Sequence, residues 1–98
     1  MTYTTVGKEV SGDAAIVRDD VAENIKATWR YVQDKTGVDL TSRIIQAKGG
    51  ASASAGTHSD GCAFDYRSRG LTTTQINAVV LALRECGWAG TWYRTGPS

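Results

Sequence analysis

His58 and Asp65 are the residues of this chain whose types and spacing suit metal chemistry. His58 is the only histidine, it follows a stretch of small residues, and Asp65 lies seven positions further along the chain. Imidazole nitrogens and carboxylate oxygens both bind zinc, and a catalytic zinc site uses three protein ligands with one position left for water. Gly61 would let the backbone turn between the two, and Ala63 would leave space beside Asp65. Spacing alone is a weak signal, and a surface histidine with a strand-edge aspartate is the simpler interpretation.

The segment that carries Asp65, CAFDYRS at residues 62–68, alternates in the way that is typical of a β-strand. The face expected to point to the core carries Cys62, Phe64 and Tyr66. The opposite face carries Ala63, Asp65 and Arg67. Asp65 is therefore predicted to project from the face that a ligand can reach. Arg67 shares that face, either as a ligand for a substrate carboxylate or as a solvent-facing strand residue.

Two helices are predicted to support this segment. The first begins at Asp20, with Glu23 as capping partner, and ends before Gly37. Its apolar stripe is Val21, Ile25, Trp29 and Val32. The second begins at Thr72, with Gln75 as capping partner, and ends at Gly87. Its apolar stripe is Ile76, Val79, Val80, Leu83 and Cys86.

The remaining elements are short. SRIIQA, at residues 42–47, reads as a strand, and so does WAGTWYR at 88–94, where only one of Trp92 and Tyr93 can line a cleft. Residues 1–18 show no sustained period, and we expect an extended N-terminal arm. We therefore predict one α+β domain over residues 1–98, with a small antiparallel sheet covered by helices.

Composition narrows the classes of function. Eleven basic residues stand against ten acidic ones, so the basic excess that is typical of nucleic-acid binding is missing. No apolar run approaches the roughly 20 residues that span a bilayer, and the start has no signal-peptide pattern. We expect cytoplasmic synthesis and no membrane insertion. Cys62 and Cys86 lack C-x-x-C spacing, and we expect two free thiols.

The string GTHSDGCAFDYR, residues 56–67, resembles the S/T-x-H-x-x-G-x-A-x-D signature of the D-alanyl-D-alanine peptidases, a zinc metallopeptidase family that includes phage endolysins. Thr57, His58, Gly61, Ala63 and Asp65 fall in register. The order of predicted elements over residues 40–96 is similar to that of short actinobacterial and actinophage members.

This resemblance implies a hedgehog/DD-peptidase-like fold and a Zn²⁺ cofactor held by His58 and Asp65. It implies bacterial peptidoglycan as the substrate, with stem-peptide bonds cut by a phage endolysin or a wall-remodelling enzyme. A phage lysin that waits in the cytoplasm for a membrane pore fits the lack of a signal peptide. Arg67, Trp92 and Tyr93 are the candidates for binding substrate.

The sequence departs from the family pattern at its C-terminal end. The third ligand of the family is a histidine in a His-x-His element, and a glutamate a few residues earlier commonly acts as general base. No second histidine is present, so both are expected beyond Ser98 in a longer form of the enzyme. The alternative is a catalytically inactive cell-wall-binding or virion-associated module of the same fold.

Overall fold

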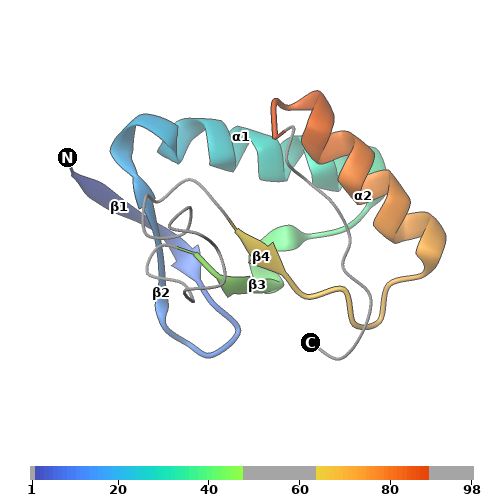
Figure 1. Ribbon diagram of the computed structural model, residues 1–98, viewed down its shortest axis with the longest axis horizontal. Helices are drawn as coiled ribbons and strands as arrows, with labels where there is room; N and C mark the ends of the chain where they lie inside the picture. The colour runs from blue at the N-terminus through green and yellow to red at the C-terminus, as the bar shows by residue number, and fades with distance from the viewer. Residues whose placement is uncertain (1, 48–63, 89–98) are drawn as a thin grey trace.

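The computed structural model describes residues 2–47 and 64–88, and its architecture is α+β as predicted. Helices α1 (Asp19–Thr36) and α2 (Thr73–Glu85) contact each other and lie above the strands in Figure 1. The strands form two small antiparallel sheets, one from β1 (Tyr3–Lys8) and β2 (Ala14–Arg18). The other consists of β3 (Ile44–Gln46) and β4 (Asp65–Tyr66), and the short 3₁₀ helix η1 (Leu40–Ser42) precedes β3.

The prediction of an extended arm over residues 1–18 is wrong, because residues 3–18 form the β1–β2 hairpin. Threonine, tyrosine and valine, which favour strands, dominate β1. In β2, Ala15 and Val17 alternate with exposed or half-buried neighbours and are fully buried against the core. Gly12 has a φ of 99° in the turn, a conformation that glycine adopts without steric cost.

Helix α1 follows β2 without an intervening residue, and this changes its N-terminus. Its N-cap is Arg18, which makes no side-chain capping bond, so the predicted Asp20–Glu23 capping box is wrong. Asp19 instead accepts hydrogen bonds from the hydroxyls of Thr2 and Thr4. Asp20 forms an ion pair with Arg18 at 2.8 Å. Both carboxylates lie in the first turn, where the helix dipole favours negative charge.

The predicted ends of the helices are otherwise confirmed. Gly37 closes α1 with a φ of 77°, and its N–H donates to the carbonyl of Gln33. Thr72 caps α2 by accepting from the N–H of Gln75, whose side chain accepts in turn from the N–H of Thr72. Gly87, just beyond the helix, has a φ of 96°.

The core lies between the two helices and the strands. Helix α1 buries Ile25, Trp29 and Val32, as the apolar stripe predicts. In α2 the fully buried stripe is narrower than predicted, since Val79 and Leu83 are buried while Ile76, Val80 and Cys86 are half-buried.

Four aromatic residues join the layers and are called the aromatic cluster below: Trp29, Phe64, Tyr66 and Trp88. The ring of Phe64 stacks on Tyr66 with centroids 5.8 Å apart, and it makes T-shaped contacts with Trp29 and Trp88 at centroid distances of 5.6 and 6.3 Å. The indole N–H of Trp29 donates to the hydroxyl of Tyr66 over 2.8 Å. This bond links the middle of α1 to β4.

Candidate functional site

The register of β3 and β4 decides where Asp65 points. Ile44 pairs with Tyr66 and Gln46 pairs with Asp65, so three residues of β3 face two of β4 and Ile45 is the extra residue of a bulge. The side chain of Tyr66 belongs to the aromatic cluster and so points to the core, and consecutive strand residues point to opposite faces of a sheet. Asp65 therefore lies on the outer face of the β3–β4 sheet, as the alternation predicts.

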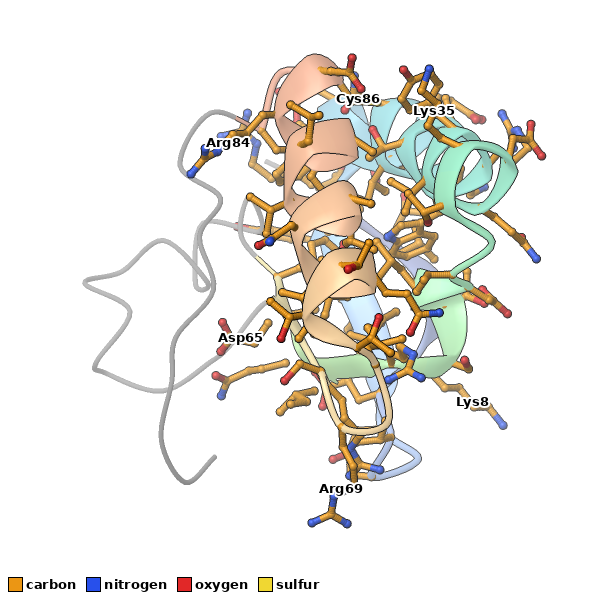
Figure 2. The ribbon with its side chains drawn as sticks, turned by 90° about the vertical axis from the view of Figure 1, so that its right-hand side faces the viewer. Lys8, Lys35, Asp65, Arg69, Arg84 and Cys86 are labelled. Carbon is orange, nitrogen blue, oxygen red and sulfur yellow. The ribbon has the colours of Figure 1, made fainter. Side chains whose placement is uncertain are left out.

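The side chain of Asp65 is half-buried on this outer face. Figure 2 shows it projecting away from Lys35 and helix α1. Its carboxylate belongs to the ligand class that zinc accepts. Within residues 2–47 and 64–88, no three histidine, cysteine, aspartate or glutamate side chains are grouped so that they could hold a metal ion.

His58, Trp92 and Tyr93 lie outside the described residues. The pairing of His58 with Asp65 on one ion therefore stays a prediction, and so does the placement of Trp92 or Tyr93 beside substrate. Of the expected strand at 88–94, only Trp88 lies within the described residues. Of the two cysteines, Cys86 has a free thiol at the end of α2, in agreement with the prediction.

Arg67 is exposed just after β4, and the backbone around it is fixed by Arg43. The N–H of Arg67 donates to the carbonyl of Arg43 over 2.7 Å. In return, the guanidinium of Arg43 donates to the carbonyls of Arg67 and Arg69, at 3.1 and 2.7 Å. These three bonds hold residues 67–69 against the start of β3. The backbone position from which the side chain of Arg67 extends is therefore fixed.

The turn of the β1–β2 hairpin approaches β3, which no pattern in the sequence indicates. The N–H of Val10 donates to the carbonyl of Ile44 over 2.7 Å. One carboxylate oxygen of Glu9 accepts from the N–H of Ala47 over 3.0 Å. The hairpin thereby holds the end of β3, directly opposite Asp65 in the ladder, and supplies Val10 to the outer face.

A hollow of about 180 Å³ opens beside the β3–β4 ladder. Its walls are Val10 from the hairpin turn, Ile45 from the bulge, and Arg67 and Arg69 from the segment after β4. Val10 and Ile45 are 41% and 38% exposed. The site therefore combines one outward carboxylate with a small hollow that is partly apolar and partly cationic.

Two further findings bound the function. Neither helix in the described part of the chain is long and apolar enough to cross a membrane. Comparisons with known protein families, with curated proteins and with solved structures find no match. The resemblance to the peptidase family therefore depends on the spacing of residues 57–65 and on the strand register around Asp65.

Proposed function

We propose that this chain is a zinc-dependent peptidoglycan peptidase domain in which His58 and Asp65 are two of the metal ligands. The observation that carries the proposal is the outward orientation of Asp65. Phe64 and Tyr66 anchor β4 to the core on one face, which leaves the carboxylate between them on the other. A histidine and an aspartate in this signature need that register in order to share an ion.

The residues of the chain would divide the work as follows. Asp65 and His58 would hold the ion, which supplies Lewis-acid polarisation of a scissile carbonyl and acidification of bound water. Arg67, exposed beside Asp65, would bind a carboxylate of the stem peptide and orient the substrate. Tyr66 and its bond to Trp29 would act as positioning residues, because they fix the strand from which Asp65 projects.

Two ligands are fewer than catalytic zinc sites use. With a single histidine in the 98 residues, we expect the chain by itself to bind zinc weakly and to release little product from peptidoglycan. The alternative function, wall binding without cleavage, is favoured by this same shortage of ligands. Partner and substrate are the same in both cases, namely bacterial peptidoglycan.

The test is a zinc titration of the 98-residue protein against a chromophoric chelator, followed by incubation with purified peptidoglycan and zinc. The variants Asp65→Asn and His58→Ala should each weaken zinc binding about tenfold or more, because each removes one of two ligands. Asp34→Asn is the matched control, since Asp34 is an exposed aspartate on α1. New amino termini, measured by amine labelling, report cleavage.

The outcomes separate the candidates. If neither variant differs from Asp34→Asn in zinc affinity, the metal proposal is wrong. Zinc binding that depends on both residues, joined by cleavage once a His-x-His segment is appended, supports the peptidase. If the wild-type protein sediments with peptidoglycan but the extended protein releases no amines, the wall-binding module is the better description.

A further inference from the structure

Glu9, in the turn of the β1–β2 hairpin, makes a side-chain contact that spans 38 positions of the chain. One oxygen of its carboxylate accepts a hydrogen bond from the N–H of Ala47 over 3.0 Å. Ala47 is fully buried and follows directly after the last residue of β3. A buried backbone N–H without an acceptor is costly, and a bond to a carboxylate is stronger than one to a neutral oxygen. The carboxylate of Glu9 therefore holds the end of β3.

The backbone of Glu9 is itself held in place within the turn. Its N–H donates to the carbonyl of Asp13 over 2.7 Å, and its carbonyl accepts from the N–H of Gly12 over 2.9 Å. The side chain of Glu9 is half-buried. Because the backbone is already ordered by these bonds, the carboxylate is an anchor in a defined position.

A second bond from the same turn reaches the other side of the bulge in β3. The N–H of Val10 donates to the carbonyl of Ile44 over 2.7 Å. The bulged residue, Ile45, therefore lies between two points that the hairpin turn holds, namely Ile44 and Ala47. A bulge changes the direction of the side chains beside it, so a restraint on both sides of the bulge fixes that direction.

The β3–β4 ladder is too short to set its own register. Strand β3 has three residues and β4 has two. An isolated pair of strands is at best marginally stable, and a slip of one residue exchanges the faces to which the side chains point. In such a slip Asp65 would turn to the core and Tyr66 would turn outward. The outward position of Asp65 therefore depends on contacts from outside the ladder.

Different parts of the chain restrain the two residues of β4. Tyr66 accepts the indole N–H of Trp29, which fixes that residue to α1. Asp65 pairs with Gln46, and the bond from Glu9 holds the residue that follows Gln46. The hairpin turn is therefore the restraint that acts at the Asp65 end of the ladder.

We propose that Glu9 is a positioning residue for Asp65, acting through its hydrogen bond to Ala47 and through the pairing of Gln46 with Asp65. The bond keeps the Asp65 carboxylate on the outer face in one orientation and thereby raises the affinity of the site for zinc. This role deepens the proposed function and rests on it for the identity of Asp65 as a metal ligand. Glu9 acts as a hydrogen-bond acceptor, and neither its charge nor contact with the ion is required.

Two substitutions at position 9 separate a hydrogen-bond acceptor from a charge. Glu9→Ala removes the acceptor, whereas Glu9→Gln removes the charge and keeps a carbonyl oxygen at the same reach. Asp13→Ala is the matched control, because Asp13 is an exposed aspartate of the same turn whose carboxylate accepts from the hydroxyl of Ser11. All variants are compared below their melting transitions, where each is folded.

The first readout contains no metal. Three-bond couplings to the carboxyl carbon of Asp65, measured by NMR in ¹³C,¹⁵N-labelled protein, report the populations of its χ1 rotamers. We expect one dominant rotamer in the wild type, in Glu9→Gln and in Asp13→Ala. In Glu9→Ala we expect averaged couplings, because the end of β3 frays and the backbone of Asp65 moves with it. If Glu9→Ala does not fold, Glu9→Asp, which is one methylene shorter, replaces it with the same expectation.

The second readout is zinc affinity, measured by competition with a chromophoric chelator. Loss of a group that orients a metal ligand typically lowers metal affinity about 10- to 100-fold. Because Asp65 itself stays, we expect Glu9→Ala to weaken binding about fivefold to tenfold, while Glu9→Gln and Asp13→Ala stay within about twofold of the wild type. In an Asp65→Asn background, Glu9→Ala should have no further effect. A purely structural role would leave the zinc affinity of the folded protein unchanged.

The outcomes distinguish the role of Glu9 from the proposed function. Couplings of Asp65 that are the same in Glu9→Ala and in the wild type would overturn the positioning role, as would a Glu9→Gln variant that binds zinc as weakly as Glu9→Ala. If zinc binding depends on Asp65 but Glu9→Ala binds like Asp13→Ala, the metal site stands and the positioning role is wrong. If the wild type binds no zinc but the couplings average in Glu9→Ala alone, the proposed function is wrong and the positioning of Asp65 by Glu9 stands.

Discussion

Replacing Tyr66 with phenylalanine removes one hydroxyl from the aromatic cluster and leaves the ring in place. That hydroxyl accepts the indole N–H of Trp29 over 2.8 Å, and the Trp29 side chain is 5% exposed. The stacking of residue 66 on Phe64 does not involve the oxygen atom. The substitution therefore isolates the hydrogen bond that links α1 to the strand that carries Asp65.

The expected cost follows from what the substitution leaves behind. A hydrogen bond contributes about 1 kcal/mol net to stability, but a buried donor without a partner costs about 1–3 kcal/mol. Because the indole of Trp29 has little access to water, we expect Tyr66→Phe to destabilise the protein by about 1–2 kcal/mol. For a domain of this size, that corresponds to a melting temperature about 4–16 °C lower.

Urea denaturation followed by far-ultraviolet circular dichroism measures this cost, and a double-mutant cycle assigns it. Trp29→Phe removes the donor, so Tyr66→Phe should cost about 1 kcal/mol less in that background than in the wild type. Two results would refute the reasoning: a cost below about 0.3 kcal/mol for Tyr66→Phe, or a cost that is the same in both backgrounds. Either would mean that β4 does not depend on this bond for its register.

Alkaline pH provides a second readout of the same residue. Burial raises the pKa of Tyr66 well above its ordinary value of 10.0, against a smaller opposing effect of the Trp29 hydrogen bond. The unfolded chain therefore loses this proton first, and stability falls as pH rises above about 10, by up to about 1.4 kcal/mol per pH unit. Tyr66→Phe should flatten this decline. Tyr31→Phe is the comparison, because the pKa of the exposed Tyr31 is also raised, mainly by its hydrogen bond to Glu85, and its removal should flatten the decline less than Tyr66→Phe does.

Two further predictions concern the core and the start of α1. Trp29→Ala should lower the free energy of unfolding by about 3–5 kcal/mol. This is a large share of the roughly 5–15 kcal/mol by which a small domain is stable. A melting temperature within a degree or two of that of the wild type would contradict the packing of α1. Hydrogen bonds from Thr2, and to a smaller extent from Thr4, lower the pKa of Asp19 in the folded protein. The stabilisation that the ionised Asp19 provides is therefore fully present above the unfolded-state pKa near 3.8, and it is lost as the pH falls through the lower pKa of the folded state. The protection factors of the β1 amides, which correct for the slower intrinsic exchange in acid, should therefore fall as the pH drops below the ordinary aspartate pKa of 3.8. Asp19→Asn should lower the same protection factors at neutral pH. Equal protection factors in all three conditions would exclude the link.

Local patterns in the sequence were sufficient for the two helices and for their ends, except for the start of α1. The buried stripe of α1, the glycines at 37 and 87, and the reciprocal bonds of Thr72 and Gln75 all depend on residues within about four positions of one another. The strand at 44–46 and the outward position of Asp65 were predictable for a similar reason, because alternation along a strand is also local.

The N-terminal region shows where local reasoning fails. Residues 3–18 form a hairpin because Ala15 and Val17 bury against a core that is assembled mainly from later parts of the chain. The capping of α1 was mispredicted because its first turn is stabilised by Thr2 and Thr4, which lie 17 and 15 residues before Asp19. Neither Thr2 nor Thr4 is marked by a periodic pattern in the sequence.

The sequence by itself determined the candidate metal ligands and their spacing, since the proposal for His58 and Asp65 depends only on residue identity and order. Only the tertiary structure decided what surrounds Asp65. Val10 reaches the outer face through a backbone bond to Ile44, and Arg43 fixes residues 67–69 from more than 20 positions away. Such contacts join residues that are distant along the chain, and their partners become defined only when the packing of the core brings the segments together.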